Sequence, residues 1–168
     1  TTRAIGKFNI DDTIGVEDKR LKILVAAGTG LAPFTSMVEA DIAADPNADL
    51  SSYVLLHGAS YPNEIGYRER LDQLARENKL HYLPTISRPK EAPEWKDDTG
   101  RVEDFFKPGR LEALEQAIGL APGELTPERA VIYICGLTGT IAMTIERLLG
   151  RGFVPFHRKI RRELGFED

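Results

Sequence analysis

The feature of the sequence that most constrains the fold is a regular alternation of short apolar runs with segments of helically spaced apolar residues. The first run is LKILVAA at residues 21–27, which ends at a glycine, and a continuous apolar run of this length predicts a buried strand. Helical spacing follows from Phe34 to Ala43 and stops before Pro46, as expected for a helix that ends ahead of a proline. This segment therefore predicts a strand followed by a helix.

The alternation recurs along the chain with a period of roughly 30 residues, the length of one strand–helix–strand unit. Further strands are expected at 52–59, 79–86 and 130–136, and further helices at 64–78, 110–120 and 137–150. Strands joined through helices run parallel, and the helices cover both faces of the sheet. The sequence therefore predicts an α/β, doubly wound fold with a mainly five-stranded parallel sheet.

Ligands of such sheets bind at the carboxyl ends of the strands. Four loops are expected there, at residues 28–33, 58–66, 87–101 and 135–140. Residues 119–129, with two prolines and two glycines, are expected to be a connector inside the domain. Residues 1–20 fit no strand–helix unit, and we expect them to be the tail of a preceding segment.

The charge and the cysteine count exclude several classes of protein. With 22 basic and 26 acidic residues the net charge is -4, which argues against a general role in binding nucleic acid or membrane surfaces. The single cysteine, Cys135, cannot form an internal disulfide, and three scattered histidines lack metal-ligand spacing. No apolar run approaches the roughly 20 residues that span a bilayer. We therefore expect a cytoplasmic protein without a metal site, in which any anion site is local.

The loop after the first strand has the composition of a phosphate site. Glycines between a strand and a helix let a ligand approach the free backbone N–H groups and the positive end of the helix dipole. The usual dinucleotide fingerprint has a third glycine where this chain has Pro33, which suits the first turn of a helix. A tight turn without a ligand is the alternative for a bare pair of glycines. The candidate binding residues are Gly28, Thr29, Gly30, Leu31, Ala32 and Pro33.

The segment AAGTGLAPF at 26–34 resembles the signature of ferredoxin-NADP reductases and their relatives. Three more segments match in order, which are HGASYPNEIGYRERLDQL, ISRP with GRV, and YICGLTGTIAMTIERLL. The resemblance implies that residues 21–168 are an NADP(H)-binding domain and that residues 1–20 are the remnant of a flavin-binding barrel and linker. It also implies FAD in the full-length protein and ferredoxin, flavodoxin or an oxygenase component as partner.

The resemblance also implies a preference for NADP. An NAD-binding domain typically ends its second strand with an acidic residue, but Ala59 and Ser60 end this one and Glu64 lies beyond the turn. In NADP-using relatives, the serine and arginines that match Ser87, Arg88 and Arg101 hold the 2′-phosphate. Some relatives have an arginine at the position of Ser60, and Lys90 is a cation that could compensate for it.

At the redox end, Cys135 matches the cysteine that packs beside the nicotinamide, and it is the one candidate catalytic residue. Gly136 would keep the backbone clear of the ring, and Leu137 would open the next helix. A lone cysteine at a strand end is otherwise a buried small hydrophobe. Helical spacing places Met143 in the core.

Two alternatives to an NADP-dependent reductase stay open: a flavin-free nucleotide-binding or docking module, and an NAD-linked oxygenase reductase. The family's terminal aromatic is absent as aligned, although Phe156 or Phe166 could cover a flavin. The basic run at 157–162 suits an acidic ferredoxin or flavodoxin, or it is a solvated helix face. The chain alone is expected to bind nucleotide without transferring hydride.

Overall fold

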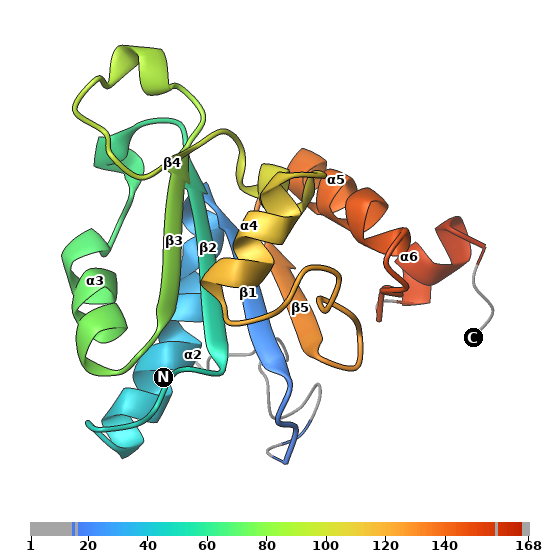
Figure 1. Cartoon of the computed structure of the whole chain (residues 1–168), viewed down its shortest axis with the longest axis horizontal. Helices are drawn as coiled ribbons and strands as arrows, with labels where there is room; N and C mark the ends of the chain where they lie inside the picture. Colours follow the sequence, from blue (N-terminus) through green and yellow to red (C-terminus); the bar gives the residue numbers. More distant parts are fainter. Residues whose placement is uncertain (1–14, 16, 157, 166–168) are drawn as a thin grey trace, which may run out of the picture.

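The computed structural model describes residue 15, residues 17–156 and residues 158–165. Within this part of the chain, a five-stranded sheet has the order β4-β3-β2-β1-β5, and all neighbouring strands are parallel (Figure 1). The strands are β1 (Leu21–Ala27), β2 (Tyr53–Ala59), β3 (His81–Ile86), β4 (Asp98–Thr99) and β5 (Ala130–Cys135). The predicted α/β, doubly wound fold is confirmed.

Helices and single turns connect the strands. The helices are α2 (Leu31–Ala44), α3 (Arg68–Glu77), α4 (Arg110–Ala117), α5 (Thr138–Leu149) and α6 (Arg158–Glu163). Short 3₁₀ turns are η1 (Gly28–Gly30), η2 (Pro62–Glu64), η3 (Pro89–Glu91) and η4 (Val102–Phe106). None of the helices in the described ranges is long and apolar enough to cross a bilayer.

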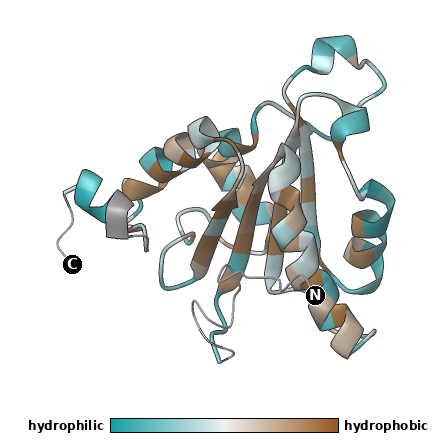
Figure 2. Cartoon of the chain, turned by 180° about the vertical axis from the view of Figure 1, so that it is seen from behind, coloured by the Kyte–Doolittle hydropathy of each residue, from teal (hydrophilic) through white to brown (hydrophobic). Residues whose placement is uncertain are grey.

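Alternate residues of the central strands pack on opposite faces of the sheet. Leu24 of β1 packs with residues of α2 and α3, whereas Ile23 and Val25 pack with η4, α4 and α5. All three are fully buried, which explains why β1 is apolar at every position instead of every second one. Figure 2 shows mostly apolar strands between helices of mixed hydropathy.

The order of the strands determines where a site forms. β1 has β2 on one side and β5 on the other, so the chain leaves β1 toward one edge and later returns to β5 on its opposite side. The loops after β1 and β5 therefore leave the sheet toward opposite faces, and a crevice opens at the carboxyl ends of these two strands.

The observed elements differ from the predicted ones in two places. β4 lies inside the segment that was predicted as loop. It was missed because two exposed residues are too few to show a periodic pattern. The helix expected from residue 64 begins at Arg68, because Pro62–Glu64 forms η2 and Tyr67 takes a left-handed conformation with φ 57°.

The connector at 119–129 belongs to the domain, as predicted. Leu120 and Leu125 are buried in the core beneath α4 and α5. The buried carboxylate of Glu115 accepts hydrogen bonds from the backbone N–H groups of Gly123 and Leu125, both at 2.8 Å, and pairs with Arg151 at 2.7 Å. The Glu115 side chain of α4, paired with Arg151 just after α5, therefore fastens this tract to the domain.

Several sequence predictions concern residues outside the described ranges. Of residues 1–20, only residue 15 and residues 17–20 are described, so the barrel remnant stays a prediction. Phe166 lies outside the described residues, and so do His157 and the side chains at 158–160 of the basic run.

Candidate functional site

The loops after β1 and β5 touch at the crevice. Ala26 of β1 is paired with Cys135 of β5, and the chain turns directly after both. A Cβ atom on Gly30 would lie 2.0 Å from the carbonyl oxygen of Cys135, and one on Gly136 would lie 2.7 Å from Cβ of Ala27. Both positions therefore require glycine, since a real Cβ never comes so close to another atom.

The predicted residues of the first loop divide into exposed and buried ones. Thr29 and Ala32 are exposed, while the side chain of Leu31 is buried with the core residues of α2. The Leu31 N–H donates to the carbonyls of Gly28 and Thr29 and so closes the turn. Pro33 lies in the first turn of α2, as predicted. Gly28 takes a left-handed φ of 55° that turns the chain out of β1.

The first turns of α2 and α5 point their backbone N–H groups toward the crevice end of the sheet. No side chain caps either helix, so no side-chain oxygen competes with a ligand for these donors. Cys135 is half-buried and Leu137, which precedes α5, is 73% exposed. The residues predicted around a nicotinamide therefore lie together beside the glycine turn.

Ser60 and Ser87 continue the sheet beyond the ends of β2 and β3. The N–H of Ser87 donates to the carbonyl of Ala59 at 3.0 Å, and the N–H of Arg88 donates to that of Ser60 at 3.2 Å. The carboxylate of Glu64 accepts from the N–H groups of Ser60 and Tyr61. The Glu64 carboxylate therefore lies at the end of β2 and caps its own turn.

Tyr61 was not predicted as a site residue, yet it forms a pair with Arg88. The Arg88 guanidinium lies 5.1 Å from the centre of the Tyr61 ring and donates a hydrogen bond to its hydroxyl. That hydroxyl donates in turn to Glu91 at 3.1 Å. An aromatic residue directly after Ser60 at a strand end was the available signal. The pair places a planar cation and an aromatic ring at the rim of the site.

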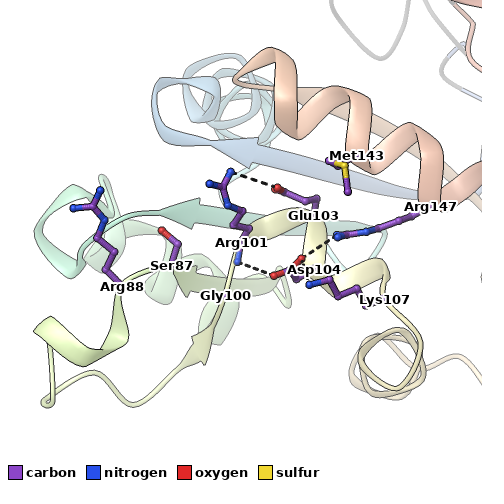
Figure 3. Close-up of a pocket in the computed structure, with 9 residues that line it drawn as sticks. All are labelled: Ser87, Arg88, Gly100, Arg101, Glu103, Asp104, Lys107, Met143 and Arg147. Atoms are coloured by element: carbon purple, nitrogen blue, oxygen red, sulfur yellow. Dashed lines mark hydrogen bonds and ion pairs between the residues drawn. The ribbon is translucent and has the colours of Figure 1, made fainter.

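Ser87, Arg88 and Arg101 line one cleft of about 570 Å³, in which Figure 3 shows their side chains. The structure thus brings together three residues predicted to contact the same phosphate. The other lining residues are Gly100, Glu103, Asp104, Lys107, Met143 and Arg147. Lys90 is exposed on η3 and is not among them, so its role as a compensating cation stays a prediction.

Met143 corrects a second prediction. Its helical spacing indicated a core residue, but its side chain is 39% exposed and lines this cleft. The buried residues of α5 are Thr140, Thr144 and Leu148 instead. The helix is therefore rotated relative to the predicted orientation, because two threonines take core positions that a hydrophobicity pattern does not assign to them.

Asp104 connects three of the lining residues. Its carboxylate lies 2.8 Å from Nζ of Lys107 and 3.0 Å from Nη1 of Arg147, and it accepts from the N–H of Arg101 at 3.2 Å. Burial opposes its ionisation, but Lys107 and the Arg101 N–H hold the pKa of Asp104 below its ordinary value. Glu103 lies 3.9 Å from Nη1 of Arg101. The cleft is thus a charged network built by η4, α5 and the loop before them.

The loop that carries Arg88 and Arg101 is held from both sides. Arg68 of α3 donates to Asp97 at 2.8 Å and lies over the rings of Tyr82 and Trp95 at 5.6 and 5.5 Å. Arg110 of α4 donates to the carbonyl of Thr99 at 2.7 Å. These contacts fix the chain just ahead of Arg101.

No metal centre accompanies these residues, since the described ranges contain no group of three or more histidine, cysteine, aspartate and glutamate side chains suited to hold an ion. What the arrangement can bind is an extended anionic ligand. One end of it would meet the glycine turn, and the other would meet the positively charged cleft.

Comparison with known proteins shows similarity to nucleotide-binding domains of oxidoreductases. Residues 24–146 match the family described as oxidoreductase NAD-binding domain. The chain is 31% identical over 134 residues to ferredoxin--NADP reductase B of Sorangium cellulosum, an alignment that covers 79% of this chain and 50% of that protein. It is 33% identical over 140 residues to ferredoxin--NADP reductase of Azotobacter vinelandii, covering 77% and 48%.

A solved structure gives the same match. A ferredoxin NADP+ reductase from Neisseria gonorrhoeae, with bound FAD and NADP, superposes with a TM-score of 0.65 at 26% identity, over 86% of this chain and 54% of that one. The chain therefore spans about half the length of the relatives it matches.

Proposed function

Because the chain belongs to the oxidoreductase NAD-binding domain family, as a nucleotide-binding domain of the ferredoxin-NADP reductase superfamily, we propose that it binds NADP(H) for a flavin-dependent reductase. The observation that carries this proposal is the cleft in which Ser87, Arg88 and Arg101 meet. A hydroxyl and two guanidiniums suit the 2′-phosphate dianion that distinguishes NADP from NAD.

The diphosphate would lie on the glycine turn. Gly28, Thr29 and Gly30 present backbone there, and the uncapped first turn of α5 supplies N–H donors. The contact between Gly30 and the Cys135 carbonyl supports this assignment, because it keeps side chains out of the crevice. Ala59 and Ser60, at the end of β2, would lie between the two phosphate sites.

At the other end of the ligand, the nicotinamide when bound supplies a hydride and a flavin accepts it. The residues of this chain orient the ring and exclude water. Cys135 would pack against the ring, and Gly136 lets the loop after β5 pass close to the end of β1, since any Cβ there would meet Ala27. Leu137, exposed beside them, would cover the site from solvent.

The rest of the proposed reaction requires a flavin, which would be held by an FAD-binding domain. We propose that residues 1–20 join this chain to such a domain and that the chain alone binds nucleotide without oxidising it. Support comes from the relatives, whose length is about twice the matched part. We further propose a ferredoxin, a flavodoxin or an oxygenase component as the electron partner, in line with the names of the ferredoxin reductases that this chain resembles, and the cytoplasm as the compartment.

One observation favours a second candidate, an NAD-linked reductase. Glu103 and Asp104 line the same cleft as the arginines, and a carboxylate there could accept a hydrogen bond from a ribose 2′-hydroxyl. An NADH-cytochrome b5 reductase of Scheffersomyces stipitis is also a relative, at 28% identity over 113 residues. The preference for NADP or NAD depends on whether the arginines or the carboxylates of this cleft contact the ribose 2′ position.

Titration calorimetry with NADP⁺ and NAD⁺ tests the proposal directly. We expect NADP⁺ to bind more tightly, and Arg88→Ala to weaken NADP⁺ by about ten-fold, the equivalent of one charge-assisted contact, while NAD⁺ changes little. Equal affinities for the two nucleotides, or an Arg88→Ala variant that binds NADP⁺ like the wild type, would overturn it.

A further inference from the structure

Two cations on the far wall of the cleft have no role in the function proposed above. Lys107 follows η4 and Arg147 lies on α5, and both line the cleft with Arg88 and Arg101 (Figure 3). Asp104 stands between them, 2.8 Å from Lys107 and 3.0 Å from Arg147. Two cations thus share one carboxylate, and their charge is only half neutralised.

The charges of the whole cleft also leave an excess of positive charge. Its lining contains four cationic side chains, two arginines on the loop side and Lys107 with Arg147 on the helix side, against the carboxylates of Glu103 and Asp104. The surplus is two positive charges in a chain whose net charge is -4. This surplus matches in size, and is opposite in sign to, the charge of about -2 on a phosphate dianion.

Arg147 holds its charge beside Asp104 at the wall of the cleft. Its Nη1 is buried 3.0 Å from the Asp104 carboxylate. Because Asp104 is shared with Lys107, a phosphate acceptor in the cleft would still be attracted to the Arg147 guanidinium. Lys107, whose side chain is 48% exposed, can extend from Asp104 toward the same acceptor.

We infer that Lys107 and Arg147 are specificity-determining residues for the 2′-phosphate, supplying from η4 and α5 the charge that Ser60 does not supply at the end of β2. The inference rests on the proposed function, since it extends the same nucleotide site. Asp104 acts as the positioning residue: it holds both cations and the N–H of Arg101 at one side of the cleft.

The test uses two small probes that differ only in where the phosphate is attached, 2′-AMP and 5′-AMP, together with NADP⁺ and NAD⁺. Lys107→Gln should weaken 2′-AMP and NADP⁺ by about five-fold, and Arg147→Gln by about ten-fold, as expected for loss of one charge contact each. Binding of 5′-AMP and NAD⁺ should change less than about two-fold. Arg147→Lys should retain most of the affinity.

Matched controls remove the same charges at the opposite end of the sheet. Lys19→Gln lies ahead of β1 and Arg129→Gln ahead of β5, and both should bind 2′-AMP as the wild type does. Lys107 has an exposed side chain, so Lys107→Gln should fold normally. If this variant binds 2′-AMP as tightly as the wild type, and the wild type still prefers 2′-AMP to 5′-AMP, the inference is wrong and the proposed function stands. A wild type without that preference overturns both.

Discussion

At the residue scale, the crevice depends on one glycine that lies against the end of β5. Gly30→Ala would place a Cβ 2.0 Å from the Cys135 carbonyl oxygen, so one of the two loops must move. We expect the free energy of unfolding to fall by at least about 2 kcal/mol, as for other overpacked sites, and nucleotide binding to be lost. Urea unfolding and calorimetry measure the two effects.

Gly150→Ala is the matched control for this substitution. Gly150 follows α5 with φ -62°, and a Cβ added there would meet no atom of the described residues within 4 Å. The stability of this variant and its affinity for NADP⁺ should both equal those of the wild type. A Gly30→Ala variant that behaved like this control would show that the two loops do not need their close contact.

His57 makes a prediction about pH. It is buried in β2, with Nδ1 3.1 Å from the Tyr82 hydroxyl. Burial, with the nearby Arg68 charge adding to it, lowers the pKa of His57 from 6.5 to about 4. Between these values the unfolded chain binds more protons than the folded one, so the free energy of unfolding must fall as the pH falls.

The expected loss from about pH 6.5 to about pH 4 is about 3 kcal/mol, because a tenfold difference in proton affinity between the folded and unfolded chains is worth about 1.4 kcal/mol. Urea titrations of the wild type and His57→Asn over this range isolate the contribution, since other titrating groups are common to both. The two curves should run parallel above about pH 7, where histidine is neutral in both states, and converge below it. Curves parallel throughout would show that His57 binds a proton as readily in the folded chain as in the unfolded one.

Individual residues were predictable from the sequence where a strand end fixes their place. Ser87, Arg88 and Arg101 flank one loop, and the register of β3 with β2 brings that loop to the site. Lys107 and Arg147 could not be predicted in this way, because their meeting depends on how η4 and α5 pack. Met143 was wrongly assigned to the core for the same reason. A periodic pattern shows which residues share one side of a helix, but it does not show which element packs against that side.

At the element scale, the loop between β3 and η4 needs an external support. It rises above the sheet beside α3 (Figure 1) and contains only η3 and β4 as regular structure. Although burial works against its charge, Asp97 and Asp72 hold the pKa of Arg68 above its ordinary value. The Arg68 guanidinium therefore stays charged between the rings of Tyr82 and Trp95 and fastens the loop to α3.

Arg68→Met should release this loop. We expect deuterium uptake at residues 95–99 to increase, and the affinity for NADP⁺ to fall by about five-fold, equivalent to about 1 kcal/mol, because Arg88 and Arg101 lose their fixed spacing. Arg70→Met is the control: it removes an arginine from the same helix, but one that pairs with Glu39 on α2 at 2.7 Å. If both variants bind NADP⁺ alike, the loop does not depend on Arg68.

Elements with a strong pattern were predicted well, and those without one were not. β1, β2, β3 and β5 are apolar runs between turn residues, and their alternation with helices determines the parallel sheet. β4 has only two residues, and they form a strand because they pair with β3. The sequence around β4 therefore contains no pattern that predicts a strand. The start of α3 was placed too early because the left-handed turn at Tyr67 is made by a residue that rarely adopts it.

At the scale of the whole molecule, average charge and local charge have opposite signs. The chain as a whole carries -4, which should repel an anionic nucleotide, whereas the cleft carries a surplus of two positive charges. The screening length is about 10 Å at 0.1 M salt. A bound phosphate therefore interacts with the cleft more strongly than with acidic residues spread over the remaining surface.

This contrast predicts how salt changes specificity. NADP⁺ carries a phosphate dianion that NAD⁺ lacks, so raising the ionic strength from about 0.05 to about 0.5 M should lower the ratio of their affinities several-fold, since the interaction that is screened is attractive. Calorimetry of both nucleotides across this range, with the ratio as readout, cancels effects on the shared diphosphate. If the net charge of the chain were dominant, screening would relieve repulsion and the ratio would rise. A ratio independent of salt would mean that the 2′-phosphate is not recognised by charge, and the cleft between η4, α5 and the loop after β3 would then need another ligand.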